Sequence, residues 1–242
     1  MTSSTTYKLE VAPSASQLAR LCAEHVASLI DLALDERDRA HIALSGGTTP
    51  AAAYRVLNQE HLPWNRVDVV LGDERWVNAN DPASNARMLR ETLLAEGGPG
   101  SGARFHPVPT ELESPMASVD AFERYVRDLC PGDPPVFDVM LLGLGDDGHT
   151  ASLFPGTPAT RETTRLVTIG AGKGMERISL TAPVLSAARQ VIFLVSGVAK
   201  GEALARLLDP TESPERTPAK LVQPQASVLV LADSDAAQSL PV

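Results

Sequence analysis

Three residues that could perform acid–base chemistry follow an apolar run near the middle of the chain. The run FDVMLLG (137–143) is typical of a buried strand, and it leads into LGDDGHTASLFP (144–155), which contains Asp146, Asp147 and His149. A connecting turn requires the glycines of this stretch but not two carboxylates and an imidazole. An aspartate two residues from a histidine could orient the ring and raise its basicity, as in a general base. We therefore predict that His149 is a base oriented by Asp147.

A second loop has the composition of a phosphate anchor. SGGTTP (45–50) follows the apolar run AHIAL (40–44), and its glycines would let the backbone approach a ligand closely. Free N–H groups and the dipole of the helix that follows would favour an anion. A capped turn without a ligand is an equally simple interpretation of this motif alone. The candidate phosphate-binding residues here are Ser45, Gly46, Gly47 and Thr48.

Two further loops carry cationic side chains at the ends of apolar runs. Lys200 lies in SGVAKGEAL (196–204), where it would place an ammonium beside another helix N-terminus. A solvated lysine is the alternative. In DERW (73–76), Asp73 and Arg75 alternate along a strand end and could point into one crevice, and arginine suits two-point recognition of carboxylate or phosphate. Glu74 is expected to belong to a surface ion network.

These loops need a common scaffold, and the alternation of short apolar runs with helical patterns predicts one. Several runs are almost continuously apolar, as in strands covered on both faces, and ligands bind at the carboxyl ends of such strands. We predict one α/β domain over residues 1–242: a doubly wound, mostly parallel sheet with helices on both faces. The predicted strands are 40–44, 67–72, 137–143, 165–169, 177–181, 190–195 and 227–231, and the predicted helices 14–34, 49–58, 84–96, 116–130, 183–188 and 198–208.

Composition limits the possible partners. The chain has 242 residues, 43% of them hydrophobic, and a formal net charge of −9 without a basic stripe, so no nucleic-acid partner is expected. Cys22 and Cys130 are expected in the core. No signal peptide or membrane span is recognisable, which indicates a soluble, cytoplasmic protein. We expect no cofactor and no metal, because dinucleotide and Walker motifs are missing and the histidines lack ligand spacing.

In this order, the motifs resemble those of the 6-phosphogluconolactonases, which share a superfamily with glucosamine-6-phosphate isomerases and deaminases. The resemblance is carried by SGGTTP, GDERWV with DPASNARM (81–88), LGLGDDGHTASLFP, RISLT and SGVAK, between about residues 40 and 205. It implies a Rossmann-like fold of the sugar-phosphate isomerase type and hydrolysis of 6-phospho-D-glucono-1,5-lactone to 6-phosphogluconate. The implied partner is a small sugar-phosphate lactone, and the chain is expected to be a monomer or a small homo-oligomer.

The resemblance also implies roles for individual residues. His149 would activate water, Asp147 would orient it, and Arg75 would hold the substrate or the developing oxyanion. Asp73 would form a polar wall of the sugar pocket. The phosphate would be held by Ser45, Gly46, Gly47, Thr48 and Lys200, with Arg177 as a weaker candidate.

One position separates the two activities of the superfamily. The deaminases carry a glutamate five residues after the motif histidine, and here Phe154 stands at that position. The change argues for the lactonase, whereas Asp73 would suit either activity. A deaminase-like isomerase and a non-catalytic sugar-phosphate sensor are the alternatives. The segment GAGKGMERISLT (170–181), which holds Lys173 and Arg177, departs most from the family pattern.

Overall fold

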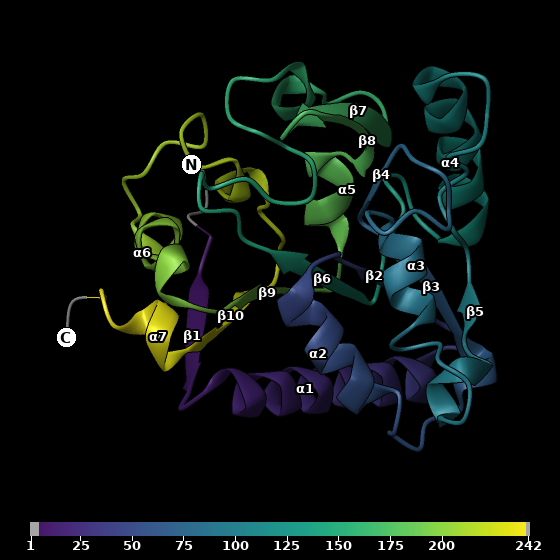
Figure 1. Ribbon diagram of the computed structural model, residues 1–242, viewed down its shortest axis with the longest axis horizontal. Helices are drawn as coiled ribbons and strands as arrows, with labels where there is room; N and C mark the ends of the chain where they lie inside the picture. Colours follow the sequence, from purple (N-terminus) through teal and green to yellow (C-terminus); the bar gives the residue numbers. More distant parts are fainter. Residues whose placement is uncertain (1–4, 241–242) are drawn as a thin grey trace.

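A seven-stranded parallel sheet runs through the computed structural model, which describes residues 5–240 (Figure 1). Every neighbouring pair in it is parallel, as the βα alternation predicts. In spatial order its strands are β1 (Tyr7–Ala12), β10 (Val228–Asp233), β9 (Gln190–Val195), β6 (Val139–Gly143), β2 (Ala40–Leu44), β3 (Val67–Leu71) and β5 (Arg104–Phe105).

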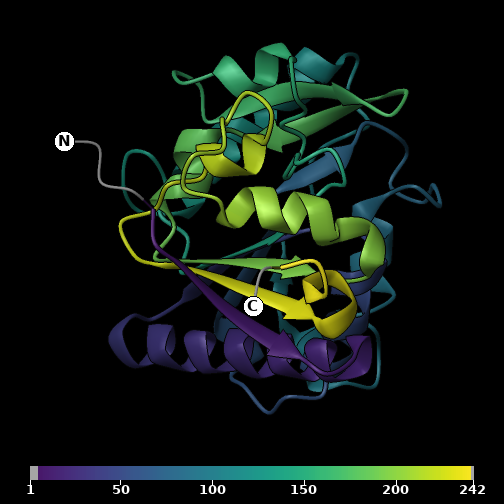
Figure 2. The same ribbon diagram turned by 90° about the vertical axis from the view of Figure 1, so that its left-hand side faces the viewer.

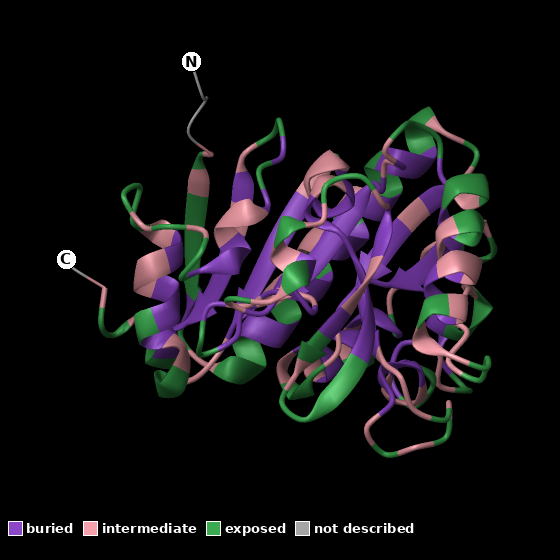
Figure 3. Ribbon diagram, turned by 90° about the horizontal axis from the view of Figure 1, so that it is seen from above, coloured by how far each residue is buried: buried purple, intermediate pink, exposed green. Residues whose placement is uncertain are grey.

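The inner strands of this sheet are buried on both faces, whereas the edge strand β1 is mostly exposed (Figure 3). This burial explains why the inner strands are almost continuously apolar. The sequence analysis missed β1 and β5. The first of these, YKLEVA, alternates apolar and charged residues, which is the pattern of a half-buried strand.

Helices cover both faces of the sheet, so the predicted doubly wound fold is confirmed. In Figures 1 and 2, α1 and α2 lie below the sheet, while α5 and α6 lie above it. The α-helices are α1 (Ala15–Glu36), α2 (Thr48–Leu57), α3 (Asn85–Arg90), α4 (Pro115–Leu129), α5 (Ala182–Ala187), α6 (Gly201–Leu208) and α7 (Ser234–Ala237). Short 3₁₀ helices span Trp64–Arg66, Pro99–Gly102, Pro158–Arg161, Val198–Lys200 and Pro218–Leu221.

Two predicted strands lie outside the main sheet. β7 (Val167–Gly172) and β8 (Met175–Leu180) form a hairpin that pairs with β4 (Asp73–Arg75) in a separate antiparallel sheet. A two-residue turn can join only antiparallel neighbours, which excludes this pair from a parallel sheet. The helix predicted over 84–96 is also shorter than expected, because α3 ends at Arg90 and turns follow it.

The chain passes from one sheet to the other at Gly72. Its N–H donates to the Leu44 carbonyl at 2.8 Å, and its carbonyl accepts from the Leu180 N–H at 2.9 Å. β3 thus ends in the main sheet, and β4 begins directly afterwards in the small one. This change of sheet places Asp73 and Arg75 at the carboxyl end of the parallel strands, where ligands bind in such folds.

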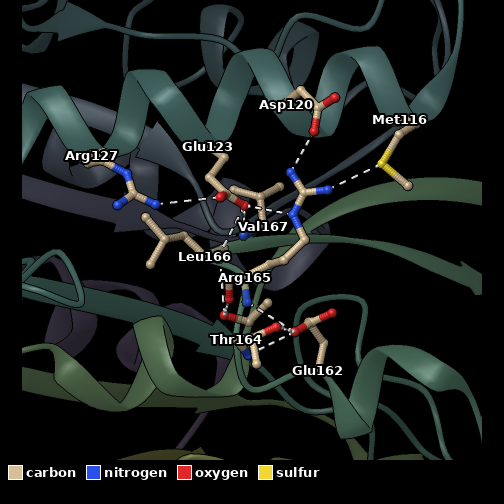
Figure 4. Close-up of polar contacts among 10 residues, drawn as sticks. Met116, Asp120, Glu123, Arg127, Glu162, Thr164, Arg165, Leu166 and Val167 are labelled. Atoms are coloured by element: carbon tan, nitrogen blue, oxygen red, sulfur yellow. Dashed lines mark hydrogen bonds and ion pairs between the residues drawn. The ribbon is translucent and has the colours of Figure 1, made fainter.

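Two carboxylates of helix α4 anchor the base of the small sheet, and both of them bind Arg165 (Figure 4). The Arg165 guanidinium donates to Asp120 Oδ1 at 2.6 Å and to Glu123 Oε2 at 3.0 Å. The same Glu123 oxygen accepts from the backbone N–H groups of Leu166 and Val167 at 3.3 and 3.4 Å. These bonds fix the beginning of β7 against the helix.

Two further expectations concern the cysteines and membrane-spanning helices. Cys22 and Cys130 are buried free thiols, as expected of core residues. Within residues 5–240, none of the helices combines the length and the apolar character needed to cross a bilayer.

Candidate active site

A cavity of about 240 Å³ opens at the carboxyl ends of β2, β6 and β9, next to the junction with β4. It gathers residues from five segments that are far apart in sequence: 45–50, 73–85, 143–151, 173–177 and 194–200. Nine of the ten predicted site residues line it, and the tenth, Asp147, is bonded to one of them. The nine are Ser45, Gly46, Gly47, Thr48, Asp73, Arg75, His149, Arg177 and Lys200.

The His149 side chain is held by Asp147 through one ring nitrogen. Nδ1 lies 2.5 Å from Asp147 Oδ1, and the same oxygen accepts the backbone N–H of His149 at 3.1 Å. Burial works to raise the pKa of Asp147, but the bonds from His149 outweigh it and the net shift is downward. The ionised carboxylate accepts a hydrogen bond from the Nδ1–H group, which leaves the lone pair of the neutral ring on Nε2. Within residues 5–240, Nε2 has no hydrogen-bond partner.

Burial keeps this imidazole neutral. It lowers the pKa of His149 below the usual value of 6.5, and the Asp147 carboxylate opposes that shift only in part. The ring of Phe154 packs against the imidazole with 4.2 Å between centroids and provides part of the burial. A neutral imidazole with a free lone pair facing a cavity can accept a proton from water at neutral pH.

The glycine at position 145 is required by this arrangement. A Cβ there would lie 2.0 Å from His149 Nδ1 and 2.5 Å from Asp147 Oδ1, so any side chain would displace the pair. The loop is closed by the Gly145 N–H, which donates to the His149 carbonyl at 2.8 Å. Thr150 Oγ1 donates to the Gly143 carbonyl at the end of β6, also at 2.8 Å.

The N-terminus of α2 has no side-chain cap. Ser14 and Ser114 cap α1 and α4 by accepting a first-turn N–H, whereas Gly47 at the start of α2 has no side chain to do so. The first-turn N–H groups at Thr48 and Thr49, which both line the cavity, are thus free for an anion.

A buried tyrosine fixes the loop that precedes α2. The Ser45 N–H donates to the Tyr54 hydroxyl at 3.0 Å, and that hydroxyl donates to the Ser45 carbonyl at 2.8 Å. Tyr54 lies in α2, so the helix that follows this loop also holds the loop in place. Ser45 Oγ is buried and has no partner within residues 5–240, which leaves this hydroxyl available to a ligand.

Asn85 is a site residue that the sequence analysis missed. Its Oδ1 accepts from Arg75 Nη1 at 2.5 Å, and its Nδ2 donates to the Asp73 carbonyl at 2.9 Å. A Cβ at position 46 would lie 1.9 Å from that Oδ1, which explains why this position is glycine. Asn85 therefore joins the loop at Gly46 to β4. The segment DPASNARM contained it, but nothing local to the segment indicates this contact.

The prediction for Glu74 was wrong. Its side chain is buried instead of joining a surface ion network, with only 1% of the residue exposed. The carboxylate accepts from the backbone N–H groups of Arg75, Asn85 and Ala86 at 2.7–2.8 Å, and from the Ser84 hydroxyl at 3.1 Å. Burial raises its pKa, and these bonds oppose the rise. Glu74 fixes the start of α3, and with it Asn85, against β4.

Asp73 and Arg177 form the wall of the cavity nearest the small sheet. Asp73 Oδ2 accepts from the Ser152 hydroxyl at 2.5 Å and lies 3.7 Å from Arg177 Nη1. The guanidinium also lies over the Phe154 ring, 5.3 Å from its centroid. Burial lowers the pKa of Arg177, and the Asp73 charge opposes that shift.

Lys200 lines the same cavity as residues 45–48. It ends the 3₁₀ turn Val198–Lys200 and stands at the N-cap position of α6, in agreement with its predicted place at a helix start. Burial lowers its pKa, and Asp146 acts in the opposite direction. Within the described residues, no three His, Cys, Asp or Glu side chains are grouped so as to hold a metal ion.

Comparison with known proteins places the chain in one family. Residues 13–231 match the model of the family described as glucosamine-6-phosphate isomerases/6-phosphogluconolactonase. The chain is 41% identical over 218 residues to a 6-phosphogluconolactonase of Synechocystis sp., covering 89% of this chain and 90% of that protein. A relative of the same description from Nostoc sp. is 38% identical, covering 97% and 98%. The solved structure of 6-phosphogluconolactonase from Trypanosoma brucei aligns with a TM-score of 0.86 at 28% identity, covering 98% of this chain and 100% of that one. The chain belongs to the glucosamine-6-phosphate isomerase/6-phosphogluconolactonase family.

Proposed function

We propose that the chain hydrolyses 6-phospho-D-glucono-1,5-lactone to 6-phosphogluconate by general-base activation of water. The observation that carries this proposal is the His149 imidazole, whose Nδ1 is bonded to Asp147 while Nε2 is free at the cavity. The relatives named 6-phosphogluconolactonase over nearly the whole chain support the choice of substrate.

The reaction requires one proton to be moved twice. Nε2 of His149 takes a proton from water as the water oxygen bonds to the lactone carbonyl carbon, which gives a tetrahedral oxyanion. The oxyanion collapses, the bond from that carbon to the ring oxygen breaks, and the imidazolium returns the proton to the departing oxygen. Asp147 stabilises the imidazolium between these two steps and keeps the ring oriented.

Arg75 is suited to holding the carbonyl oxygen or a neighbouring hydroxyl. Its Nη1 is bonded to the Ala83 carbonyl at 2.8 Å and to Asn85 Oδ1, so the guanidinium is already positioned before substrate binds. A charge fixed in advance can stabilise an oxyanion without reorganising during the reaction.

The phosphate of the substrate would lie at the start of α2. The uncapped start of α2, the Ser45 hydroxyl and the Lys200 ammonium supply donors of the kind that a phosphate dianion needs. Binding there would anchor the substrate and reduce the entropy lost in reaching the transition state.

Phe154 distinguishes this proposal from isomerisation or deamination. It stands where the deaminases place a glutamate, is buried, and packs on His149. A phenyl ring can neither donate nor accept the proton that ring opening of an amino sugar requires. The intact His149–Asp147 pair argues against a sensor that only binds, because binding requires no base.

The test is lactone hydrolysis by the purified protein. Glucose-6-phosphate dehydrogenase would generate the lactone, 6-phosphogluconate dehydrogenase would report the product, and the spontaneous rate without protein would be subtracted. We expect clear acceleration, and a His149→Ala variant should bring the rate close to the spontaneous value. A folded wild-type sample that does not accelerate hydrolysis would refute the proposal.

A further inference from the structure

The two edges of the main sheet differ in length. β1 spans six residues, Tyr7–Ala12, whereas β5 at the opposite edge spans only Arg104–Phe105. Within residues 5–240, β1 pairs with β10 on one side and with no strand on the other. Figure 2 looks onto this edge, with β1 in front of the sheet. A strand whose N–H and C=O groups lack partners along one side is a template for a further strand.

The hydrogen bonds between β1 and β10 decide which backbone groups of β1 point outward. The Val228 N–H donates to the Thr6 carbonyl at 2.8 Å, and Tyr7 lies opposite Val228 in the parallel register. The backbone groups of successive residues point to opposite sides of a strand, so the even-numbered residues of β1 bond toward β10. The N–H and C=O groups of Tyr7, Leu9 and Val11 therefore point away from the sheet.

The side chains of β1 have the same pattern in both directions from Leu9. Tyr7 and Val11 flank it on its own face, while Lys8 and Glu10 lie on the opposite face. The strand thus reads apolar, charged, apolar, charged, apolar, with the two charges of opposite sign. A two-fold interface requires such a pattern, because one surface must be complementary to itself.

These side chains are also accessible. Leu9 and Val11 are 36% and 49% exposed, which is unusual for large apolar residues of a strand. Glu10 Oε2 is bonded to His25 Nε2 of α1 at 3.0 Å, so the charged face of β1 lies on the α1 side of the sheet. Lys8 is exposed and has no hydrogen-bond or ion-pair partner within residues 5–240.

We propose that β1 pairs with β1 of a second copy of this chain, antiparallel and centred on Leu9, so that the two sheets join across a two-fold axis. In this register Leu9 faces Leu9, Tyr7 faces Val11, and Lys8 faces Glu10 of the other copy. The apolar pairs exchange the outward N–H and C=O groups. The Lys8–Glu10 pairs alternate with them, at positions where side chains approach most closely.

The charges select this register. If the pairing is centred on Lys8 or on Glu10, two like charges lie directly opposite each other, which is destabilising. If it is centred on Tyr7 or Val11, Lys8 and Glu10 no longer face each other. The register about Leu9 alone forms two lysine–glutamate pairs.

The resulting contact is small and closes after two copies. A strand of this length buries less than the ~1,200 Å² of a stable interface, so we expect a weak dimer with a Kd of about 10–100 µM. In the described part of the chain, β5 at the opposite edge is too short to form a similar contact. Pairing therefore ends with two copies and does not continue into a filament.

The alternative is that Lys8 and Glu10 protect the edge from association, as charged side chains on edge strands commonly do. The two interpretations differ when the charges are reversed. Protective charges act with either sign, whereas the proposed pairs need opposite signs.

The experiment measures the molar mass of the purified chain, 25.7 kDa as a monomer, by sedimentation equilibrium. The concentration range is about 1–200 µM, which brackets the expected Kd. The charge variants are Lys8→Glu, Glu10→Lys, and the double variant that carries both substitutions. Leu9→Pro removes one outward N–H and no donor to β10, and Lys8→Arg is the control that keeps the charge. Circular dichroism verifies that each variant is folded.

We expect Lys8→Glu and Glu10→Lys each to raise the dimer Kd at least about tenfold, because each places like charges opposite each other twice. The double variant should regain the wild-type Kd. An equimolar mixture of the two single variants should regain it as well, since the acidic positions of one then face the basic positions of the other. Leu9→Pro should sediment as a monomer, and Lys8→Arg should match wild type.

Two results would overturn the proposal. One is a wild-type chain that remains monomeric over the whole concentration range. The other is an association that single charge reversal leaves unchanged, or that neither the double variant nor the mixture restores.

Discussion

Within residues 5–240, two histidine rings are hydrogen-bonded to an aspartate side chain, and only one of these rings has a nitrogen left for a ligand. At the carboxyl ends of the strands, His149 is bonded to Asp147 through Nδ1, and Nε2 is free at the cavity. Near the start of β3, His106 Nε2 lies 2.7 Å from Asp68 Oδ1, and its Nδ1 is bonded to the Tyr125 hydroxyl. Both ring nitrogens of His106 are thus occupied, and no lone pair remains for a substrate proton.

Asp68, the aspartate of the second pair, also lies among more charged partners than Asp147 does. Burial works to raise the pKa of Asp68, but hydrogen bonds from Arg39 and His106 outweigh it and lower the pKa overall. Asp138 nearby is paired with Arg37 and Arg189 at 3.0 and 3.3 Å. These contacts tie the amino ends of β2, β3 and β6 together. A histidine–aspartate pair therefore indicates catalysis only when the second ring nitrogen opens onto a cavity.

The strongest test of this contrast removes each histidine in turn. His149→Ala should lower kcat by about 10³-fold, within the range of a lost general base, without changing the far-UV circular dichroism spectrum. His106→Ala should keep kcat within about twofold of wild type, because it contacts no residue of the cavity lining given above. Similar losses of kcat in both variants would show that the free nitrogen is not the difference that matters.

Replacing the aspartate of each pair should have a smaller effect on kcat, and the pH profile of kcat/KM shows its cause. Asp147→Asn should lower kcat by about 10²-fold, because the ring loses the charge that stabilises its protonated form. The Asp147 charge opposes the lowered pKa of His149, so its removal should move the acid limb of kcat/KM to still lower pH. Asp68→Asn, the matched change in the other pair, should leave the pH profile in place. A profile unmoved by Asp147→Asn would contradict an orienting role.

The His106–Asp68 pair should contribute more to the free energy of unfolding than the His149–Asp147 pair does. His106→Ala leaves Asp68, which is only 3% exposed, without one of its hydrogen bonds. The expected loss is about 1–3 kcal/mol in the free energy of unfolding, measured by urea denaturation at neutral pH. His149→Ala should lose less, since removal of that ring leaves the half-exposed Asp147 able to bind water. A larger stability loss at His149 would reverse the contrast between the two pairs.

The comparison also shows which features can be predicted from sequence. The candidate base and its partner are recognisable because they are local: Asp147, Gly148 and His149 are adjacent, and the apolar run before them identifies the strand. Asn85 and Glu74 acquire their roles only through distant contacts, with Gly46 in one case and the start of α3 in the other. No local pattern encodes such contacts.

The same limit applies to the sheets. Each of 165–169 and 177–181 is a convincing strand by composition, but composition does not name a strand's neighbours. The two-residue turn Lys173–Gly174 does contain that information, because it is too short for a parallel crossover. The fold class followed from the buried strands, whereas the small antiparallel sheet required attention to the turn.

The smallest expected effect concerns Phe154, which packs on the His149 ring without a polar group, whereas Tyr125 both packs on the His106 ring and hydrogen-bonds to it. The wild-type enzyme should gain kcat/KM as the pH rises through the pKa of His149, which lies below 6.5, because only the neutral ring accepts a proton. Phe154→Leu should admit water to the imidazole, weaken the desolvation that lowers this pKa, and move the acid limb upward by less than about one pH unit. The shift is opposite in sign to that expected of Asp147→Asn, so the two variants separate desolvation from charge as the controls on the base. A downward shift in Phe154→Leu would mean that the neighbouring Arg177 cation, freed from the ring that it now covers, acts more strongly on His149 than water does.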